Sequence, residues 1–220
     1  MKTGLTELAF ILDKSGSMCG LETDTIGGFN AMLSKQQEVE GECRITTVLF
    51  DNCYELLHDR VDIKAVKPIT QEEYQVGGTT ALLDAVGITI HKIAQVQKNT
   101  AADYRAEKVL FVIITDGQEN ASREYSSCKV KELIKSRQKE DDWEFIFLGA
   151  NIDAVEAAGH IGIPANRAQN YHADCIGTAH TYAAVACSAA EFRAAPAGAK
   201  LNDDWNLELQ EDYASRASKR

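Results

Sequence analysis

Three oxygen-bearing side chains directly follow a short apolar run near the N-terminus. Asp13, Ser15 and Ser17 come after Leu8 to Leu12, a run typical of a buried strand. Positions i, i+2 and i+4 of an extended segment lie on one side, so one carboxylate and two hydroxyls can converge on one point. A purely oxygen ligand set favours Mg²⁺, with Mn²⁺ or Ca²⁺ as alternatives, over zinc or copper. The stretch therefore predicts a site for a small divalent cation.

Two later segments carry polar groups that belong with this motif. Gly77-Gly78-Thr79-Thr80 precedes a helical pattern, and Thr115-Asp116-Gly117 follows the apolar run Val109 to Ile114. In an open α/β sheet, ligands bind in the crevice beyond the carboxyl ends of the strands. Asp13 and Asp116 both fall at such ends, so we expect these segments to converge.

The elements that must position these loops alternate between strand and helix. Continuous apolar runs at Ile45 to Phe50, Val109 to Ile114 and Phe145 to Leu148 predict central parallel strands that are buried on both faces. Helical spacings lie between them, starting near Ile26, Leu82 and Val130. This alternation predicts an α/β fold with a doubly wound, mostly parallel sheet and helices on both faces.

The remaining segments complete this fold. The turn at Asp51-Asn52 leaves no room for a crossover helix, which predicts an antiparallel edge strand from Tyr54 to His58. Asn151 or Asp153 opens a short helix, Ala168 to His172 forms a last strand, and Asp174 to Arg193 forms a final helix. We expect a domain over residues 1–195 and a solvated, dispensable C-terminal tail over 196–220.

Composition argues against some classes of function. The 220 residues suit one large domain, and a net charge of -10 with scattered Lys and Arg argues against a nucleic-acid-binding surface. No stretch approaches the roughly 20 apolar residues of a membrane span, and no signal peptide is evident. The 6 cysteines lack CxxC pairs, as is typical of reduced thiols in a cytoplasmic protein. We therefore expect a cytoplasmic protein without nucleic-acid or membrane partners; its oligomeric state is not indicated.

Together, the three motifs resemble the metal-ion-dependent adhesion site of the von Willebrand factor A domain family: DxSxS, then a threonine, then an aspartate after an apolar strand. The resemblance spans about Thr6 to Arg193. It implies a doubly wound fold and the metal-site residues Asp13, Ser15, Ser17, Thr80 and Asp116. Thr80 is preferred because the family threonine lies just before a helix, and Thr79 is the alternative.

The resemblance also implies a function. In the family, the serine hydroxyls and usually the threonine contact the cation, the aspartates act directly or through water, and a partner's carboxylate completes the octahedron. This chain would then be a Mg²⁺-dependent protein-protein interaction module, not an enzyme, whose partner presents an Asp or Glu. Without a signal peptide, it resembles the intracellular, bacterial-type, stand-alone members.

The alternative is a Mg²⁺-dependent phosphohydrolase or another phosphate-handling enzyme, because a strand-end aspartate with Mg²⁺ and hydroxyls also builds phosphoryl-transfer sites. Against it, Lys14 and Ser15 follow Asp13 where a second catalytic carboxylate would be expected. No nucleophile or general base with a partner is evident, and the nucleotide motifs GxGxxG and GxxxxGK[ST] are absent.

Three polar residues near the motifs receive ordinary structural interpretations. Glu119 and Asn120 are expected to be exposed-loop residues, and Asp84 a helix-surface or capping acid.

Overall fold

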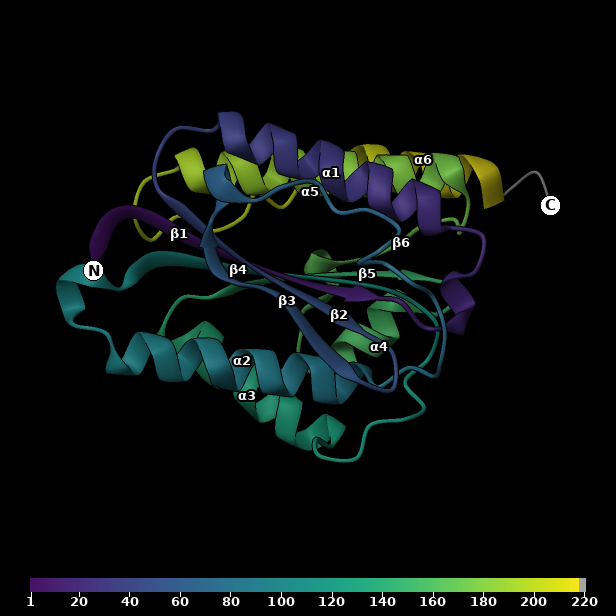
Figure 1. The fold of residues 1–220 in the computed structure, drawn as a ribbon, viewed down its shortest axis with the longest axis horizontal. Coiled ribbons are helices and arrows are strands. Elements are labelled where there is room, and N and C mark those ends of the chain that lie inside the picture. The colour runs from purple at the N-terminus through teal and green to yellow at the C-terminus, as the bar shows by residue number, and fades with distance from the viewer. Residues whose placement is uncertain (218–220) are drawn as a thin grey trace.

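A computed structural model describes residues 1–217 as a six-stranded sheet between two layers of helices (Figure 1). The strands are β1 (Lys2–Asp13), β2 (Cys43–Phe50), β3 (Tyr54–Asp62), β4 (Ala106–Asp116), β5 (Glu144–Ala150) and β6 (Ala168–Asn170). Their order in the sheet is β3-β2-β1-β4-β5-β6. Only the β2–β3 pairing is antiparallel, which confirms the mostly parallel sheet with one antiparallel edge strand.

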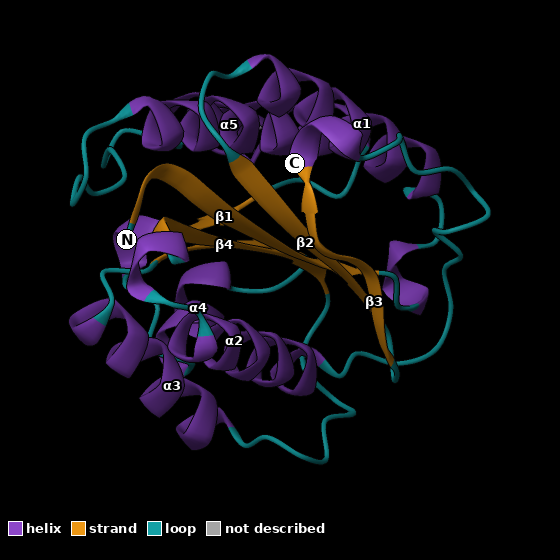
Figure 2. Cartoon of the chain, turned by 60° about the vertical axis from the view of Figure 1, so that its left-hand side comes forward, coloured by secondary structure: helices purple, strands orange, loops and turns teal. Residues whose placement is uncertain are grey.

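Helices cover both faces of the sheet, as the alternation of patterns predicts. One layer holds α1 (Glu22–Glu38), α5 (Cys175–Ala194) and α6 (Leu207–Ala217), and the other holds α2 (Leu82–Asn99), α3 (Ser127–Glu140) and α4 (Ala154–His160) (Figures 1 and 2). Among residues 1–217, no helix has the length and apolarity that crossing a membrane requires.

Alternating side chains of each central strand supply the two cores. In β1, Leu8, Phe10 and Leu12 pack in the cluster beneath α1 and α5, whereas Ala9 and Ile11 pack in the cluster beneath α2 and α3. Because helices cover both faces, all positions from Leu8 to Leu12 need apolar side chains, and this part of the strand appears in the sequence as an unbroken apolar run.

The strand order places two loops of interest side by side. After β1, the chain forms β2 and β3 on one side, then crosses to form β4 on the other side of β1. The β1–β4 register runs in step to Leu12 opposite Ile114. Asp13 and Thr115 therefore emerge together at the point where the winding reverses, the place where ligands bind in open α/β sheets.

The C-terminal segment is not the solvated tail that we expected. Leu201, Trp205 and Leu209 are buried in the same cluster as α1 and α5. The Trp205 indole N–H donates to the carbonyl of Asn166 at 2.8 Å. Trp205 and Leu209 are four residues apart, about one helical turn, so both lie on the inner side of α6 and of the turn that precedes it.

We therefore predict that α6 contributes to stability. Leu209→Ala should lower the free energy of unfolding by about 2–5 kcal/mol, because it removes a fully buried leucine. Leu207→Ala is the matched control, since Leu207 is 49% exposed on the same helix, and should change stability by no more than about 0.5 kcal/mol. Urea unfolding measures both. If both substitutions lowered the free energy of unfolding only slightly and equally, the tail would be dispensable for the fold, as the sequence predicted.

Candidate metal-binding site

Asp13 ends β1, and hydrogen bonds from both neighbouring loops hold its buried carboxylate. Oδ1 accepts from the Ser15 backbone N–H at 2.7 Å. Oδ2 accepts from the Thr115 hydroxyl at 2.6 Å and from the Asp116 backbone N–H at 3.3 Å. These donors fix the orientation of the carboxylate and connect the carboxyl ends of β1 and β4.

The two serines of the first loop converge through a tight turn. Ser15 is extended, and the chain then forms a single 3-10 turn over Gly16–Met18. This turn brings the Ser15 and Ser17 hydroxyl oxygens to 3.0 Å from one another. Ser15 is buried and Ser17 is exposed, so the pair runs from the interior to the surface. The predicted convergence is present, although the turn, not a continuous extended segment, produces it.

Thr80 lies against the third loop. It is buried, and its backbone N–H donates to the Asn120 side-chain oxygen at 2.9 Å. A Cβ atom placed on Gly117 would lie 3.8 Å from the Thr80 hydroxyl and 3.1 Å from the Ser17 hydroxyl. The hydroxyls of Thr80 and Ser17 thus both border Gly117, whereas Thr79 is exposed. This geometry favours Thr80 over Thr79.

Asp116 ends β4 beside Asp13 and is 1% exposed. Its Oδ1 accepts a hydrogen bond from the Asn151 side-chain N–H at 2.5 Å, and within residues 1–217 no hydrogen bond reaches Oδ2. Burial raises the pKa of Asp116 above its usual value; Asn151 opposes this shift and the nearby Asp13 adds to it. Two adjacent carboxylates in a buried setting favour a bound cation.

Asn151 also belongs to the site, although the sequence predicted for it only the start of a short helix. Asn151 follows β5, has a left-handed backbone (φ 55°) and directs its amide at Asp116. Asp153, not Asn151, caps α4 by accepting from the Glu156 backbone N–H. The rule that polar residues at strand carboxyl ends converge applies equally to Asn151 and would have identified it.

Asn120 is exposed in its loop, as expected, whereas Glu119 is half-buried. Glu119 accepts hydrogen bonds from the backbone N–H groups of Leu83, Ala121 and Ser122, and Asn120 binds Thr80 as described above. Asp84 does act as a capping acid, but for the loop: it accepts from the backbone N–H groups of Arg123, Glu124 and Tyr125. These bonds tie the third loop to the start of α2.

The donor set fits a small hard cation. It combines two carboxylates with three hydroxyls, from Asp13, Asp116, Ser15, Ser17 and Thr80. Oxygen ligands of this kind suit Mg²⁺. Residues 1–217 contain no group of three or more His, Cys, Asp or Glu side chains that is arranged to hold a metal ion, so hydroxyls would complete the coordination.

Two glycines in these loops leave no room for a side chain. At Gly117, a Cβ would crowd the Ser17 hydroxyl at 3.1 Å. Gly78 has a φ of 72°, and a Cβ there would lie 2.2 Å from the Asn52 side-chain oxygen.

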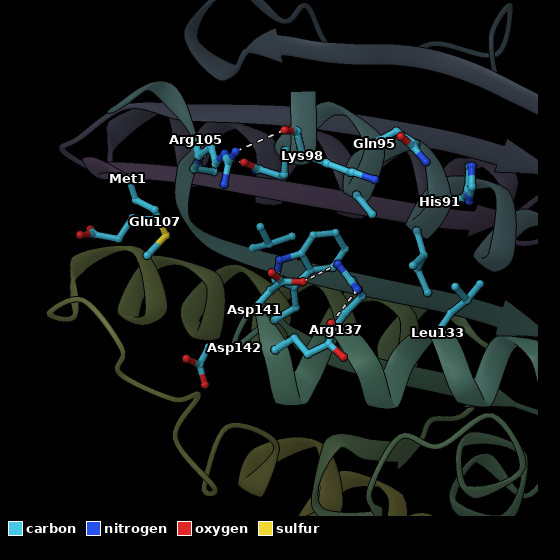
Figure 3. A pocket seen from close by; sticks show the side chains of 17 residues that line it. Met1, His91, Gln95, Lys98, Arg105, Glu107, Leu133, Arg137, Asp141 and Asp142 are labelled. Atoms are coloured by element: carbon cyan, nitrogen blue, oxygen red, sulfur yellow. Dashed lines mark hydrogen bonds and ion pairs between the residues drawn. The ribbon is translucent and has the colours of Figure 1, made fainter. Parts of the chain in front are cut away.

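A larger hollow of about 640 Å³ lies elsewhere, between the C-terminal halves of α2 and α3 (Figure 3). It is bordered by Lys98 and Arg137 and by Ala106, the first residue of β4. Asp116 is the last residue of the same strand, so this hollow lies at the amino ends of the strands and the candidate site at their carboxyl ends.

No protein-family profile and no curated protein matches the sequence. Several solved structures are similar to this chain. A mutant of the PilB minor pilin from Streptococcus sanguinis matches with a TM-score of 0.58 and 10% identity, over 87% of this chain and 63% of that chain. A von Willebrand factor type A protein from Catenulispora acidiphila matches with a TM-score of 0.55 and 12% identity, over 84% of this chain and 42% of that chain. The manganese-loaded TRAP protein of Plasmodium vivax matches with a TM-score of 0.51 and 19% identity, over 68% of this chain and 58% of that chain. The chain spans less than two thirds of each of these structures. It has the von Willebrand factor A fold.

We predict that the proximity of the two aspartates destabilises the metal-free protein. Asp116→Asn should leave the melting temperature in EDTA unchanged or raise it, because the amide keeps an oxygen for Asn151 and removes a buried charge beside Asp13. Asp103→Asn, at an exposed acid, controls for the general loss of negative charge and should have no effect. A loss of several degrees in Asp116→Asn alone would instead make Asp116 a structural hydrogen-bonding residue.

Proposed function

We propose that this chain is a von Willebrand factor A-type module that binds Mg²⁺ and, through it, an Asp or Glu side chain of a partner protein. The observation that carries the proposal is the hydrogen-bonded junction of Asp13, Thr115 and Asp116, beside which the hydroxyls of Ser17 and Thr80 both border Gly117. This junction gathers three loops that are far apart in the sequence into one oxygen-rich surface.

Each residue has a distinct proposed role. The hydroxyls of Ser15, Ser17 and Thr80 hold the cation, and the carboxylates of Asp13 and Asp116 supply the negative charge that attracts it. Both oxygens of Asp13 already accept hydrogen bonds, which favours an indirect role for this carboxylate, through water. Bound Mg²⁺ supplies a position that an incoming carboxylate can fill, since magnesium retains exchangeable ligands. Mn²⁺ or Ca²⁺ could replace it.

We propose a binding role and no catalytic one. A phosphohydrolase needs a nucleophile or general base, with cations to neutralise the phosphate. The carboxylates of Asp13 and Asp116 are held by hydrogen bonds, and Lys14, the cation of the first loop, pairs with Glu55 on β3 at 2.5 Å. The enzymatic alternative has no comparable support.

We also propose a reducing compartment, such as a bacterial cytoplasm. All six cysteines are free thiols, and only Cys43 is buried. Exposed thiols persist where glutathione or thioredoxin keeps them reduced.

Mg²⁺ should raise the melting temperature, because a ligand that binds only the folded state stabilises it by about 2.7 kcal/mol at a hundredfold excess over its Kd. Ser17→Ala should weaken the shift without harming the fold, since Ser17 is exposed. Thr80→Val should weaken it too, whereas Thr79→Val, the adjacent control, should not. Thermal unfolding in Mg²⁺ and in EDTA measures all four proteins. A wild-type protein indifferent to Mg²⁺ and Mn²⁺ would contradict the metal site.

A partner should be captured from native lysate in Mg²⁺ and released by EDTA. The captured protein should lose binding when one of its acidic residues is changed to the amide, and Ser17→Ala should capture less than wild type, with Thr79→Val as the control. Capture that is equal in EDTA, or Mg²⁺-dependent phosphoester hydrolysis that Ser17→Ala removes, would contradict the proposed function.

A further inference from the structure

A hollow of about 400 Å³ opens directly beside the candidate metal site. Its walls come from the start of α2, the loop after β4, and α4 with the segment before it. Gly117 lines this hollow and also borders the hydroxyls of Ser17 and Thr80. The hollow and the metal site are therefore parts of one continuous surface.

The floor of the hollow is apolar. Leu82 and Ile161 are 5% and 3% exposed, and Leu83, Ile152 and Ala157 are half-buried against the same core. An apolar group that enters would remove from water its own surface and the exposed parts of Leu83, Ile152 and Ala157, which favours binding by about 25 cal/mol per Å² of apolar surface buried.

The rim of the hollow is acidic. Glu119, Asp153 and Glu156 line it, and none of its lining residues is Lys or Arg. Glu119 and Asp153 accept hydrogen bonds from backbone N–H groups, and Glu156 lies 4.0 Å from His160, which also lines the hollow. Asp153 and Glu156 are exposed to solvent, so acids still outnumber basic groups at the rim. A second anionic group would be repelled here, so the hollow suits an uncharged occupant.

An adjoining hollow of about 600 Å³ is lined mainly by polar groups, among them Asn151, His172 and Asp174. Gln118, Ile152 and Asp153 line both hollows, so the two adjoin one another. An apolar side chain is favoured in the hollow with the apolar floor and not in its polar neighbour.

We infer that the hollow formed by Leu82, Leu83, Ile152, Ala157 and Ile161 receives an uncharged apolar side chain of the partner, next to the Asp or Glu that reaches the metal. This inference rests on the proposed function and adds a sequence preference: an acidic residue with an aliphatic neighbour.

Small carboxylates test the inference without the partner. The probes are acetate, 4-methylpentanoate and adipate, titrated into ¹⁵N-labelled full-length protein with Mg²⁺ and with EDTA and followed by NMR. In Mg²⁺, 4-methylpentanoate should bind about tenfold more tightly than acetate, since it adds four carbons that can be buried. Adipate carries a second carboxylate at its far end and should gain little over acetate.

Filling the hollow should remove this preference. Ala157→Leu should bring 4-methylpentanoate back to the affinity of acetate, while acetate binding is unchanged. Ala94→Leu is the matched control: Ala94 is also half-buried on a helix, but it lines the distant hollow of Figure 3, and should leave the preference intact. As a readout that needs no variant, NOEs should link the methyl groups of 4-methylpentanoate to those of Ile152 and Ile161.

The outcomes separate the two claims. Mg²⁺-dependent binding of all three probes with equal affinity, or a preference that survives Ala157→Leu without NOEs to Ile152, would overturn this inference and leave the metal site standing. Absence of any Mg²⁺-dependent carboxylate binding would overturn the proposed function and this inference with it.

Discussion

The buried carboxylate of Asp13 connects the two central strands of the sheet at the point where the winding reverses. It accepts hydrogen bonds from its own loop, at Ser15, and from the end of β4, at Thr115 and Asp116. A buried carboxylate without such donors would carry a large desolvation cost. Because its donors come from both loops, the hydrogen bonds that offset this cost also hold the two loops together. The positions of the Ser15 and Ser17 hydroxyls and of the Asp116 carboxylate all depend on this junction.

The central part of the fold can be predicted from the sequence because a parallel sheet covered on both faces needs continuous apolar strands. Runs such as Val109 to Ile114 occur where such strands are observed. The C-terminal segment was misinterpreted for a physical reason. Acidic residues surround Trp205, Leu207 and Leu209 and favoured a solvated end. An i, i+4 pair also fits one helical turn, however, and only tertiary packing shows that Trp205 and Leu209 point inward while Leu207 does not.

At the site, sequence reasoning identified the chain segments better than the supporting contacts. Asp13 and Asp116 stand out because each directly follows an apolar run and belongs to a motif with hydroxyl and glycine residues. Glu119 gave no such signal, since an acid in a polar loop is ordinary until its backbone donors are known. Its role depends on how the third loop folds against α2, a long-range contact that local patterns do not encode.

The site combines a rigid base with an open surface. Asp13, Ser15, Thr80 and Asp116 are buried, whereas Ser17 is exposed. Such an arrangement suits a cation that is held from below and still offers a position to a partner above.

The most direct test is a crystal structure of the protein with Mn²⁺, which scatters anomalously. We predict one strong anomalous peak in contact with the hydroxyl oxygens of Ser15, Ser17 and Thr80 and beside the carboxylates of Asp13 and Asp116. A fully ordered site with no peak there, or a peak only at other residues, would contradict it.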